Sequence, residues 1–348
     1  MRALVRTSRL RDGFRRLLPG DDRWGSEFGR VLIVARESGL ELTARSEDGW
    51  SRTVVSAEVS EPGQALIPLK PMRLATGRFI VEELELRVSR NSLFAKAKSS
   101  NARFACVPDD EWISPPGLDD SAIELGTEWH SALLRVASAA HASDQIYRGI
   151  RFGDGHILAS DHYTVAVLST DFGLEPFAIV ADVLKHALRD ADGPLYITVG
   201  HSVVRFRLSE SEVWARRLEV PPGDLSRVIR TDGHYHMTID RRTLAHAISL
   251  ASSVSLLEDA SPLVHLRSDG RAGLEVWCQA RDLGRVSAKL RYEGNFDGHL
   301  TFHFKHLTKV IESALSDDIT LQISSESKPV IVRDNALTHA IMPTINRG

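Results

Sequence analysis

Apolar side chains recur at helical spacing in several segments of the chain. Between residues 305 and 315 they fall at Leu307, Val310, Ile311 and Ala314, which form one stripe of an amphipathic helix. Such a stripe predicts a helix that packs one face on a core and exposes the other. Similar stripes predict helices over residues 10–18, 128–141 and 181–189, and over 240–251 with Asp240 as the N-cap.

Between the helices, apolar residues alternate or form short runs, as in β-strands. The runs are separated by turns in which Gly accompanies Ser or Asp, such as Glu37-Ser38-Gly39, and tight hairpins require such residues. One further helical segment, residues 69–75, contains Pro71 and precedes Gly77, so we expect a short or poorly formed helix there. The predicted strand pairs are 31–35 with 40–44, 150–152 with 156–159, and 263–266 with 274–278.

A four-residue phrase occurs three times at nearly equal intervals. It begins at Gly39, Gly155 and Gly273, in steps of 116 and 118 residues. A period this long indicates three domains with one plan, because solenoid repeats span only about 20–50 residues. Each third reads as two rounds of strand, helix and strands, so we predict an α+β fold with two helices packed on antiparallel sheets. The predicted domains are residues 1–119, 120–232 and 233–348.

Composition narrows the classes of protein without selecting one. The chain has 43% hydrophobic and 26% charged residues, ordinary values for a globular protein, and no apolar run approaches the ~18 residues of a membrane span. The N-terminus has no secretory pattern, so we predict a cytoplasmic protein. A net charge of −3 argues against a wholly basic surface but allows a local basic face. Cys106 and Cys278 are expected to be free thiols, with a single bridge as the alternative.

Three segments resemble the bacterial β sliding clamp family, the processivity subunit of the replicative DNA polymerase. Residues 158–167 (LASDHYTVAV) resemble the family's strand and turn ATDGHRLAV. Residues 225–229 (LSRVI) are similar to its YRRVLP segment, and residues 329–343 resemble its C-terminal ending. The order and spacing of the three thirds also agree with the family over essentially the whole chain.

The resemblance implies a head-to-tail homodimer that closes a six-domain ring around duplex DNA, with helices lining the hole. It implies no catalysis and no cofactor. DNA polymerase and clamp-loader subunits would dock through short linear peptides in a cleft between the second and third domains. A ring held on DNA by topology can slide, because it needs only weak phosphate contacts and no base readout.

Basic residues on the polar faces of the predicted helices are candidates for the DNA-facing surface. They could face phosphates, or they could be the solvated faces that most surface helices have. The loop after the first helix contributes one more basic residue. The predicted DNA-facing set is Arg9, Arg11, Arg15, Arg16, Arg23, Lys185, Arg189, Arg241, Arg242, Lys305 and Lys309.

The family's peptide cleft maps onto this chain through the matching motifs. The resemblance implies a pocket of Val165, Val228, Ile341 and Met342 for an apolar anchor. The chain departs from the family where Gly-His-Arg becomes His162-Tyr163-Thr164, which adds bulk at the glycine position. The complete implied cleft is Tyr147, Ser160, His162, Tyr163, Thr164, Val165, Arg227, Val228, His303, His306, Pro329, Ala340, Ile341, Met342 and Pro343.

The ring joint is expected where an edge strand of the first third meets the helix end of the third. Phe104 and Cys106 would contact Leu256 and Leu257 of the next copy, and the alternative is that these are simply core residues.

The sequence gives little support to two rival functions, metal binding and hydrolysis. The 14 histidines include no third ligand at diagnostic spacing, so no metal site is predicted, and no hydrolase motif is present. The alternative to a working clamp is a divergent clamp paralogue that binds proteins as an accessory, competitor or decoy without encircling DNA.

Overall fold

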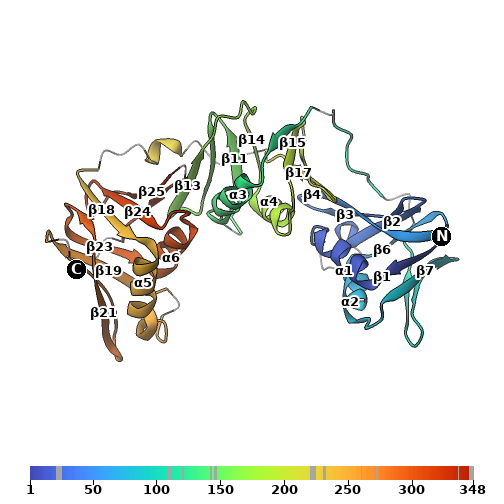
Figure 1. The fold of residues 1–348 in the computed structure, drawn as a ribbon, viewed down its shortest axis with the longest axis horizontal. Coiled ribbons are helices and arrows are strands. Elements are labelled where there is room, and N and C mark those ends of the chain that lie inside the picture. The colour runs from blue at the N-terminus through green and yellow to red at the C-terminus, as the bar shows by residue number, and fades with distance from the viewer. Residues whose placement is uncertain are drawn as a thin grey trace. The chain divides into compact units, whose positions relative to one another are not determined.

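The computed structural model describes residues 1–20, 26–108, 112–119, 121–141, 143–144, 147–219, 225–229, 233–259, 261–271, 273–335 and 337–344 (Figure 1). Contacts divide the chain into two compact units. The first unit is Met1–His130 with Asp182–Arg217, and the second is Ser131–Ala181 with Leu218–Gly348. The division into three domains stays a prediction, since α3 (Glu128–Ser138) and α4 (Ala181–Leu188) each cross the boundary between the units.

The first unit contains two antiparallel sheets. Its core lies between them and the helices α1 (Thr7–Arg16) and α2 (Leu69–Arg78), and includes Leu10, Phe14 and Met72. The five-stranded sheet has the order β5-β1-β7-β8-β9, with β1 (Arg2–Arg6), β5 (Ala57–Glu61), β7 (Glu83–Ser89), β8 (Ser92–Lys96) and β9 (Asn101–Ala105). The eight-stranded sheet has the order β10-β15-β16-β17-β4-β3-β2-β6, with β2 (Arg30–Arg36), β3 (Gly39–Ser46), β4 (Gly49–Val55), β6 (Gly63–Pro68), β10 (Ile123–Leu125), β15 (Leu195–Val199), β16 (Val203–Arg207) and β17 (Ser211–Arg216).

The second unit repeats this plan with a nine-stranded and a four-stranded sheet. Helices α5 (Arg241–Ser255) and α6 (Phe304–Ser313) lie side by side and bury Leu244, Ile248 and Leu307 in its core (Figure 1). The larger sheet runs β14-β11-β12-β13-β26-β25-β24-β18-β22, with β11 (Gly149–Gly153), β12 (His156–Ser160), β13 (Thr164–Ser169), β14 (Phe177–Val180), β18 (Tyr235–Asp240), β22 (Glu293–Gly294), β24 (Asp318–Ile323), β25 (Val330–Asp334) and β26 (Leu337–Ile341). The smaller runs β21-β20-β19-β23, with β19 (Leu263–Asp269), β20 (Gly273–Ala280), β21 (Gly284–Arg291) and β23 (Asp297–His303).

The predicted α+β class with antiparallel sheets is confirmed, and the repeated phrase has one structural position. It starts β3 at Gly39, precedes β12 at Gly155 and starts β20 at Gly273, in each case at the second strand of a hairpin. Both cysteines are free, as expected. None of the helices in the described ranges is long and apolar enough to cross a membrane.

The expectation that α2 would be short or poorly formed is wrong. The helix runs for 10 residues, as long as α1. Pro71 is its third residue, and the first turn of a helix has no partner for its N–H groups, so the proline costs nothing there. Gly77 lies in the last turn, where the cost of a glycine, about 0.5–1 kcal/mol, does not prevent the helix from forming.

Candidate functional site: helix surfaces and a turn

The arginines of α1 divide into two pairs. Arg9 and Arg15 are exposed, and Arg15 Nη1 lies 3.7 Å from Asp12 Oδ1. Arg16 forms an ion pair with Glu210 of the β16–β17 turn, and Arg11 donates from Nη2 to the Phe79 carbonyl at 3.3 Å. Two of the four predicted arginines are therefore engaged by the first unit itself. Arg23 lies outside the described residues.

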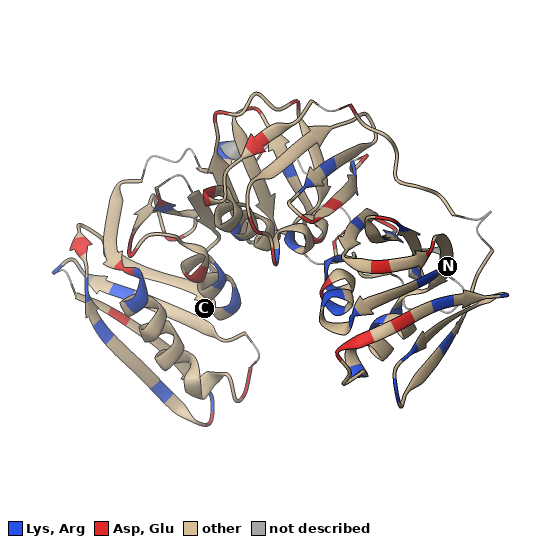
Figure 2. Cartoon of the chain, turned by 45° about the vertical axis from the view of Figure 1, so that its right-hand side comes forward, with Lys and Arg blue, Asp and Glu red and all other residues tan. Residues whose placement is uncertain are grey.

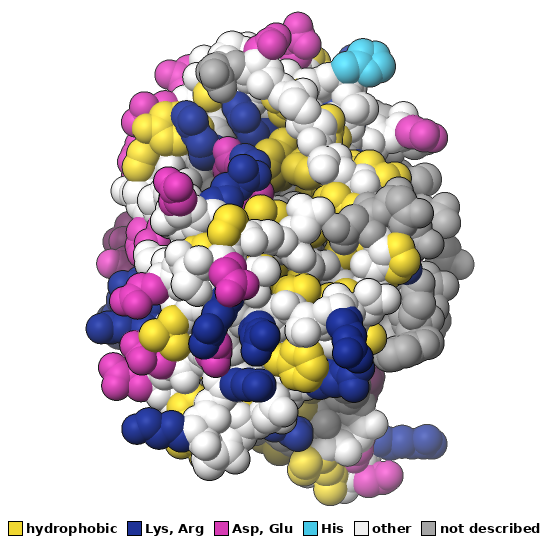
Figure 3. Space-filling view, turned by 90° about the vertical axis from the view of Figure 1, so that its right-hand side faces the viewer, with side chains coloured by type: hydrophobic (Ala, Val, Ile, Leu, Met, Phe, Trp, Pro, Cys, Tyr) yellow, Lys and Arg dark blue, Asp and Glu magenta, His cyan; other side chains and the backbone are white. Residues whose placement is uncertain are grey.

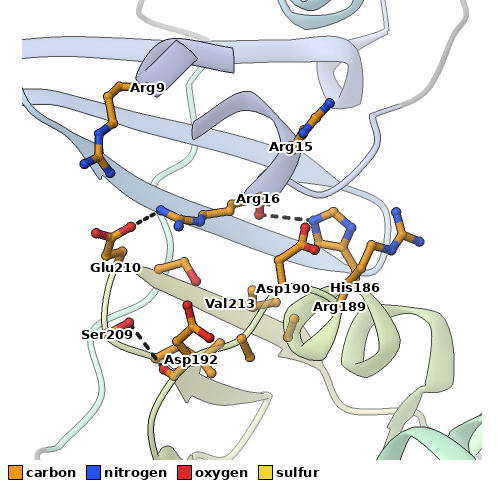
Figure 4. A pocket seen from close by; sticks show the side chains of 14 residues that line it. Arg9, Arg15, Arg16, His186, Arg189, Asp190, Asp192, Ser209, Glu210 and Val213 are labelled. Carbon is orange, nitrogen blue, oxygen red and sulfur yellow. Dashed lines mark hydrogen bonds and ion pairs between the residues drawn. The ribbon is translucent and has the colours of Figure 1, made fainter. Parts of the chain in front are cut away.

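A cavity of about 220 Å³ lies between α1, the end of α4 and the β16–β17 turn (Figure 4). Arg9, Arg15, Arg16 and Arg189 line it together with acidic residues. His186 places the end of α4, because its Nε2 lies 3.1 Å from the Arg16 carbonyl oxygen. Burial lowers the pKa of His186, and the charges of Arg189 and Arg73 lower it further, against the Arg16 carbonyl and Asp190. His186 is therefore neutral at physiological pH.

Arg73 on α2 was missed by the sequence reasoning. Burial, followed by the charges of Arg189 and Arg15, lowers the pKa of its guanidinium. Arg15 of α1 and Arg189, directly after α4, thus lie close enough to repel Arg73 of α2, which favours an anion beside them. The signal for Arg73 was in the sequence, but it required α2 to be recognised as a full helix.

In the second unit, most predicted basic residues are also engaged. Arg241 donates from Nε to the Ser316 carbonyl at 2.9 Å. Arg242 lies 3.6 Å from Asp317, and the side chains of Arg242 and Asp317 are both exposed. Lys309 donates to the buried Asp161 at 2.6 Å, so its ammonium is engaged by a protein group. Lys305 is exposed and bonds to no other residue among those described.

Basic and acidic residues both occur on the helices and on the strands (Figure 2). On α4 in the first unit, Lys185 pairs with Asp182 at 2.5 Å, and Arg189 is exposed. Figure 3 views a face on which basic, acidic and apolar side chains are intermixed, in agreement with the slightly negative net charge. Exposed ion pairs such as Lys185–Asp182 contribute little to stability and exchange readily with other charges.

The predicted cleft residues all lie in the second unit. Several of them belong to the turn between β12 and β13. Tyr163 is 53% exposed, and its carbonyl accepts a hydrogen bond from the Met342 N–H at 3.0 Å. His162 contacts Tyr147, with 4.0 Å between ring centroids, and its Nε2 lies 3.1 Å from Asp144. Ser160 and Thr164 are buried inside the turn, where the Ser160 hydroxyl donates to the Thr164 carbonyl at 2.8 Å.

The apolar pocket is assembled differently from the prediction. Val165, Ala340 and Val228 belong to one apolar cluster, with Val228 supplied by the 3-10 helix Ser226–Ile229. Ile341 instead packs in the core under α5 and α6, because successive side chains of β26 point to opposite faces of the sheet. The residue of β26 on the Val165 face is therefore Ala340, which pairs directly with Val165. Met342 remains 42% exposed beyond the end of the strand.

The remaining predicted cleft residues differ in exposure. Arg227 is exposed, Pro329 is half-buried, and Pro343 is buried. His303 and His306 are half-buried at the start of α6, with ring centroids 6.1 Å apart at nearly right angles. Burial lowers the pKa of His306, with Asp161 opposing the shift.

The predicted joint residues fall into two kinds. Phe104 is 9% exposed in the core of the first unit, and Cys106 is half-buried against that core. Leu256 and Leu257 are 40% and 78% exposed after α5. Leu283, which was not predicted from the sequence, is 52% exposed. It is held beside Leu256 and Leu257, because the Glu258 carboxylate accepts hydrogen bonds from the N–H groups of residues 281 and 282. No periodicity marks Leu283, since it lies in a turn.

No protein-family model and no curated protein matches the sequence. Solved structures do match. The DNA polymerase III β subunit sliding clamp of Bartonella birtlesii, bound to griselimycin, is 18% identical with a TM-score of 0.88, and the alignment covers 99% of each chain. The sliding clamp of Bacillus subtilis is 16% identical and the β subunit of Thermotoga maritima 15%, each with a TM-score of 0.86 and 99% of both chains covered.

The chain thus has a clamp-type fold of paired helices on antiparallel sheets. That fold is the one of the bacterial DNA polymerase III β sliding clamps, and it extends over 99% of the chain. The resemblance seen in the sequence is confirmed at the level of the fold. The sequence identity to these clamps is low, at 15–18%.

Proposed function

We propose that this protein is a DNA sliding clamp. Two copies of the chain, each with three clamp domains (residues 1–119, 120–232 and 233–348), would close a ring around duplex DNA in the cytoplasm and tether DNA polymerase. The observation that carries the proposal is the agreement of fold over 99% of both chains with solved clamps. A clamp acts by topology, so this role requires neither a catalytic site nor a cofactor.

The exposed basic residues support contact with phosphates. Arg9, Arg15, Arg189 and Lys305 are exposed on or directly after helices, and Arg73 adds a fifth charge. We propose these five as the DNA-facing set. Six residues of the predicted set are left out because protein groups engage them: Arg11, Arg16, Lys185, Arg241, Arg242 and Lys309. Non-specific phosphate contacts of this kind hold DNA weakly and permit sliding.

We propose that partners dock on the surface formed by Tyr163, Met342 and the Val165–Val228–Ala340 cluster. Exposed apolar side chains beside a preformed apolar cluster are typical of a peptide-binding surface. Griselimycin, which the Bartonella clamp binds, is a suitable probe for this part of the proposal. Calorimetric titration should give saturable binding, and the absence of heat at high griselimycin concentration would remove this surface from the proposal.

The ring itself is tested by loading fluorescent protein onto nicked circular plasmid with a bacterial clamp loader and ATP. A ring remains with the circle during gel filtration and is released when the plasmid is linearised, because it slides off the ends. Equal retention on circular and linear DNA would contradict encirclement. A chain that stays monomeric near 38.5 kDa and never joins the circle would favour the accessory paralogue instead.

A further inference from the structure

The turn at residues 161–164 is built around one carboxylate. Asp161 Oδ1 accepts hydrogen bonds from the N–H of Tyr163 at 3.2 Å, the N–H of Thr164 at 2.8 Å and the Thr164 hydroxyl at 2.8 Å. Within this turn His162 has a φ of 75°, a left-handed conformation that costs a non-glycine residue roughly 1–2 kcal/mol. The shape of the turn therefore depends on Asp161 staying in place and ionised.

Asp161 is 6% exposed, and a buried carboxylate is costly without a compensating charge. Burial alone would raise its pKa, but the hydrogen bond and charge of Lys309 lower the pKa, together with the bonds from Thr164. Lys309 Nζ lies 2.6 Å from Asp161 Oδ2 and also donates to the Ala139 carbonyl at 3.2 Å, just after α3. The ammonium thus joins α6, the end of α3 and the turn.

A second side chain of α6 contacts the same turn. His306 lies one helical turn before Lys309 and stacks on the Tyr163 ring, with 4.5 Å between centroids and 29° between planes. The Tyr163 carbonyl is bonded to Met342, so both the backbone and the ring of Tyr163 are held. Through these contacts, α6 determines where the exposed Tyr163 ring lies.

We propose that Lys309 is a positioning residue for partner docking, not a DNA contact. Its ammonium holds Asp161, Asp161 holds the left-handed turn, and the turn presents Tyr163 beside Met342. The docking role rests on the proposed function. The tie between Lys309 and the turn does not, because it can be measured on the protein alone.

Amide hydrogen exchange tests the tie directly. In Lys309→Met, the amides of Tyr163 and Thr164 should exchange about tenfold faster or more, because Asp161 is then no longer held in place and ionised by the ammonium and accepts their hydrogen bonds less well. Lys309→Arg should restore protection, and Lys305→Met, on the same helix but exposed, should leave it unchanged. Protection of the paired strands β12 and β13 should stay as in the natural chain. Unchanged exchange of the two turn amides in Lys309→Met would overturn the proposal.

A charge-deletion cycle covers the case in which Lys309→Met fails to fold. The double variant Asp161→Asn with Lys309→Met leaves no unpaired buried charge, so it should fold and recover most of the lost thermal stability. If the double variant were as unstable as Lys309→Met alone, the ammonium would have a role other than neutralising Asp161. If the natural chain were not retained on circular DNA but the variants showed the expected hydrogen-exchange changes, only the clamp function would be refuted. The tie between Lys309 and the turn would stand.

Discussion

Buried histidine side chains limit the pH range over which the second unit is stable. His339 on β26 is 2% exposed, and its Nε2 lies 3.0 Å from the Ser313 hydroxyl of α6. Burial lowers its pKa to about 4, with Asp334 opposing the shift and Arg135 and Lys309 adding to it. The ring is therefore mostly neutral in the folded protein at any pH well above 4.

The expected consequence is a loss of stability on acidification. Between pH 6.5 and about 4 an unfolded histidine binds a proton that the folded one does not, so acid favours unfolding there. Above pH 6.5 His339 does not reduce the free energy of unfolding. By pH 4 His339 alone lowers the free energy of unfolding by about 3 kcal/mol. His339→Gln should flatten the fall of the thermal midpoint between pH 7 and pH 4.5.

His246→Gln is the matched control for this measurement, because His246 is exposed on α5 of the same unit. It should leave the pH dependence as in the natural chain. Burial also lowers the pKa of His265 to about 4. The thermal midpoint of His339→Gln should therefore still fall somewhat with decreasing pH. A variant with the full natural slope would show that His339 does not set the acid limit.

Residue partners also explain which part of the site was predictable. The exposed positions of Arg9 and Arg15 follow from the apolar stripe of α1, which the sequence contains. The engagement of Arg16 does not, because Glu210 is 194 residues away, and Asp161 is 148 residues from Lys309. Helical periodicity tells which face of a helix is polar, but a distant acidic partner decides whether that face is free.

At the scale of elements, local patterns predicted the hairpins and helices well. The predicted pairs 31–35 with 40–44 and 263–266 with 274–278 lie within β2–β3 and β19–β20, and α6 closely follows the stripe from Leu307 to Ala314. The pairing of β4 with β17 was not predictable, because it joins strands about 160 residues apart with no local signal. The sequence also did not show on which face of the sheet the Ile341 side chain lies. Only the pairing of β26 with β13 shows which side chain of β26 meets Val165.

The β4–β17 pairing depends on a glycine. Gly49 has a φ of 157°, and a Cβ added there would lie 1.9 Å from the Trp214 carbonyl oxygen. Because that atom belongs to the backbone, Gly49→Ala should separate the strands locally and destabilise the first unit by about 2 kcal/mol or more. Urea unfolding monitored by tryptophan fluorescence is suitable, since Trp50 and Trp214 are buried at this pairing.

Gly77→Ala provides a control of opposite sign in the same unit. Nothing lies within 4 Å of a Cβ at Gly77, and the residue is helical, so alanine should stabilise α2 by about 0.5–1 kcal/mol. If Gly49→Ala unfolded at the same urea concentration as the natural chain, the close approach of β4 and β17 would be refuted. A destabilised Gly77→Ala would indicate that α2 has contacts that the structure does not show.

At the scale of the whole molecule, two edge strands and an apolar patch are the surfaces on which the proposed dimer would form. The strand β9 ends the five-stranded sheet of the first unit, and β21 ends the four-stranded sheet of the second. Exposed strand edges attract further strands and are usually paired or covered. The patch of Leu256, Leu257 and Leu283 lies next to the start of β21, which favours a joint in which β21 of one copy meets β9 of another.

Leu257 gives the sharpest test of this joint, because it is 78% exposed in the single chain. Leu257→Glu should leave the thermal midpoint almost unchanged, since exposed substitutions cost about 0.5 kcal/mol or less. In the dimer the carboxylate would be buried in an apolar joint, so dimer affinity should fall about 100-fold, the equivalent of about 3 kcal/mol. Light scattering should then find a mass near 38.5 kDa for the variant and twice that mass for the natural chain. Val54→Glu, at a position 51% exposed on β4, should remain dimeric, and a dimeric Leu257→Glu would exclude this patch from the ring joint.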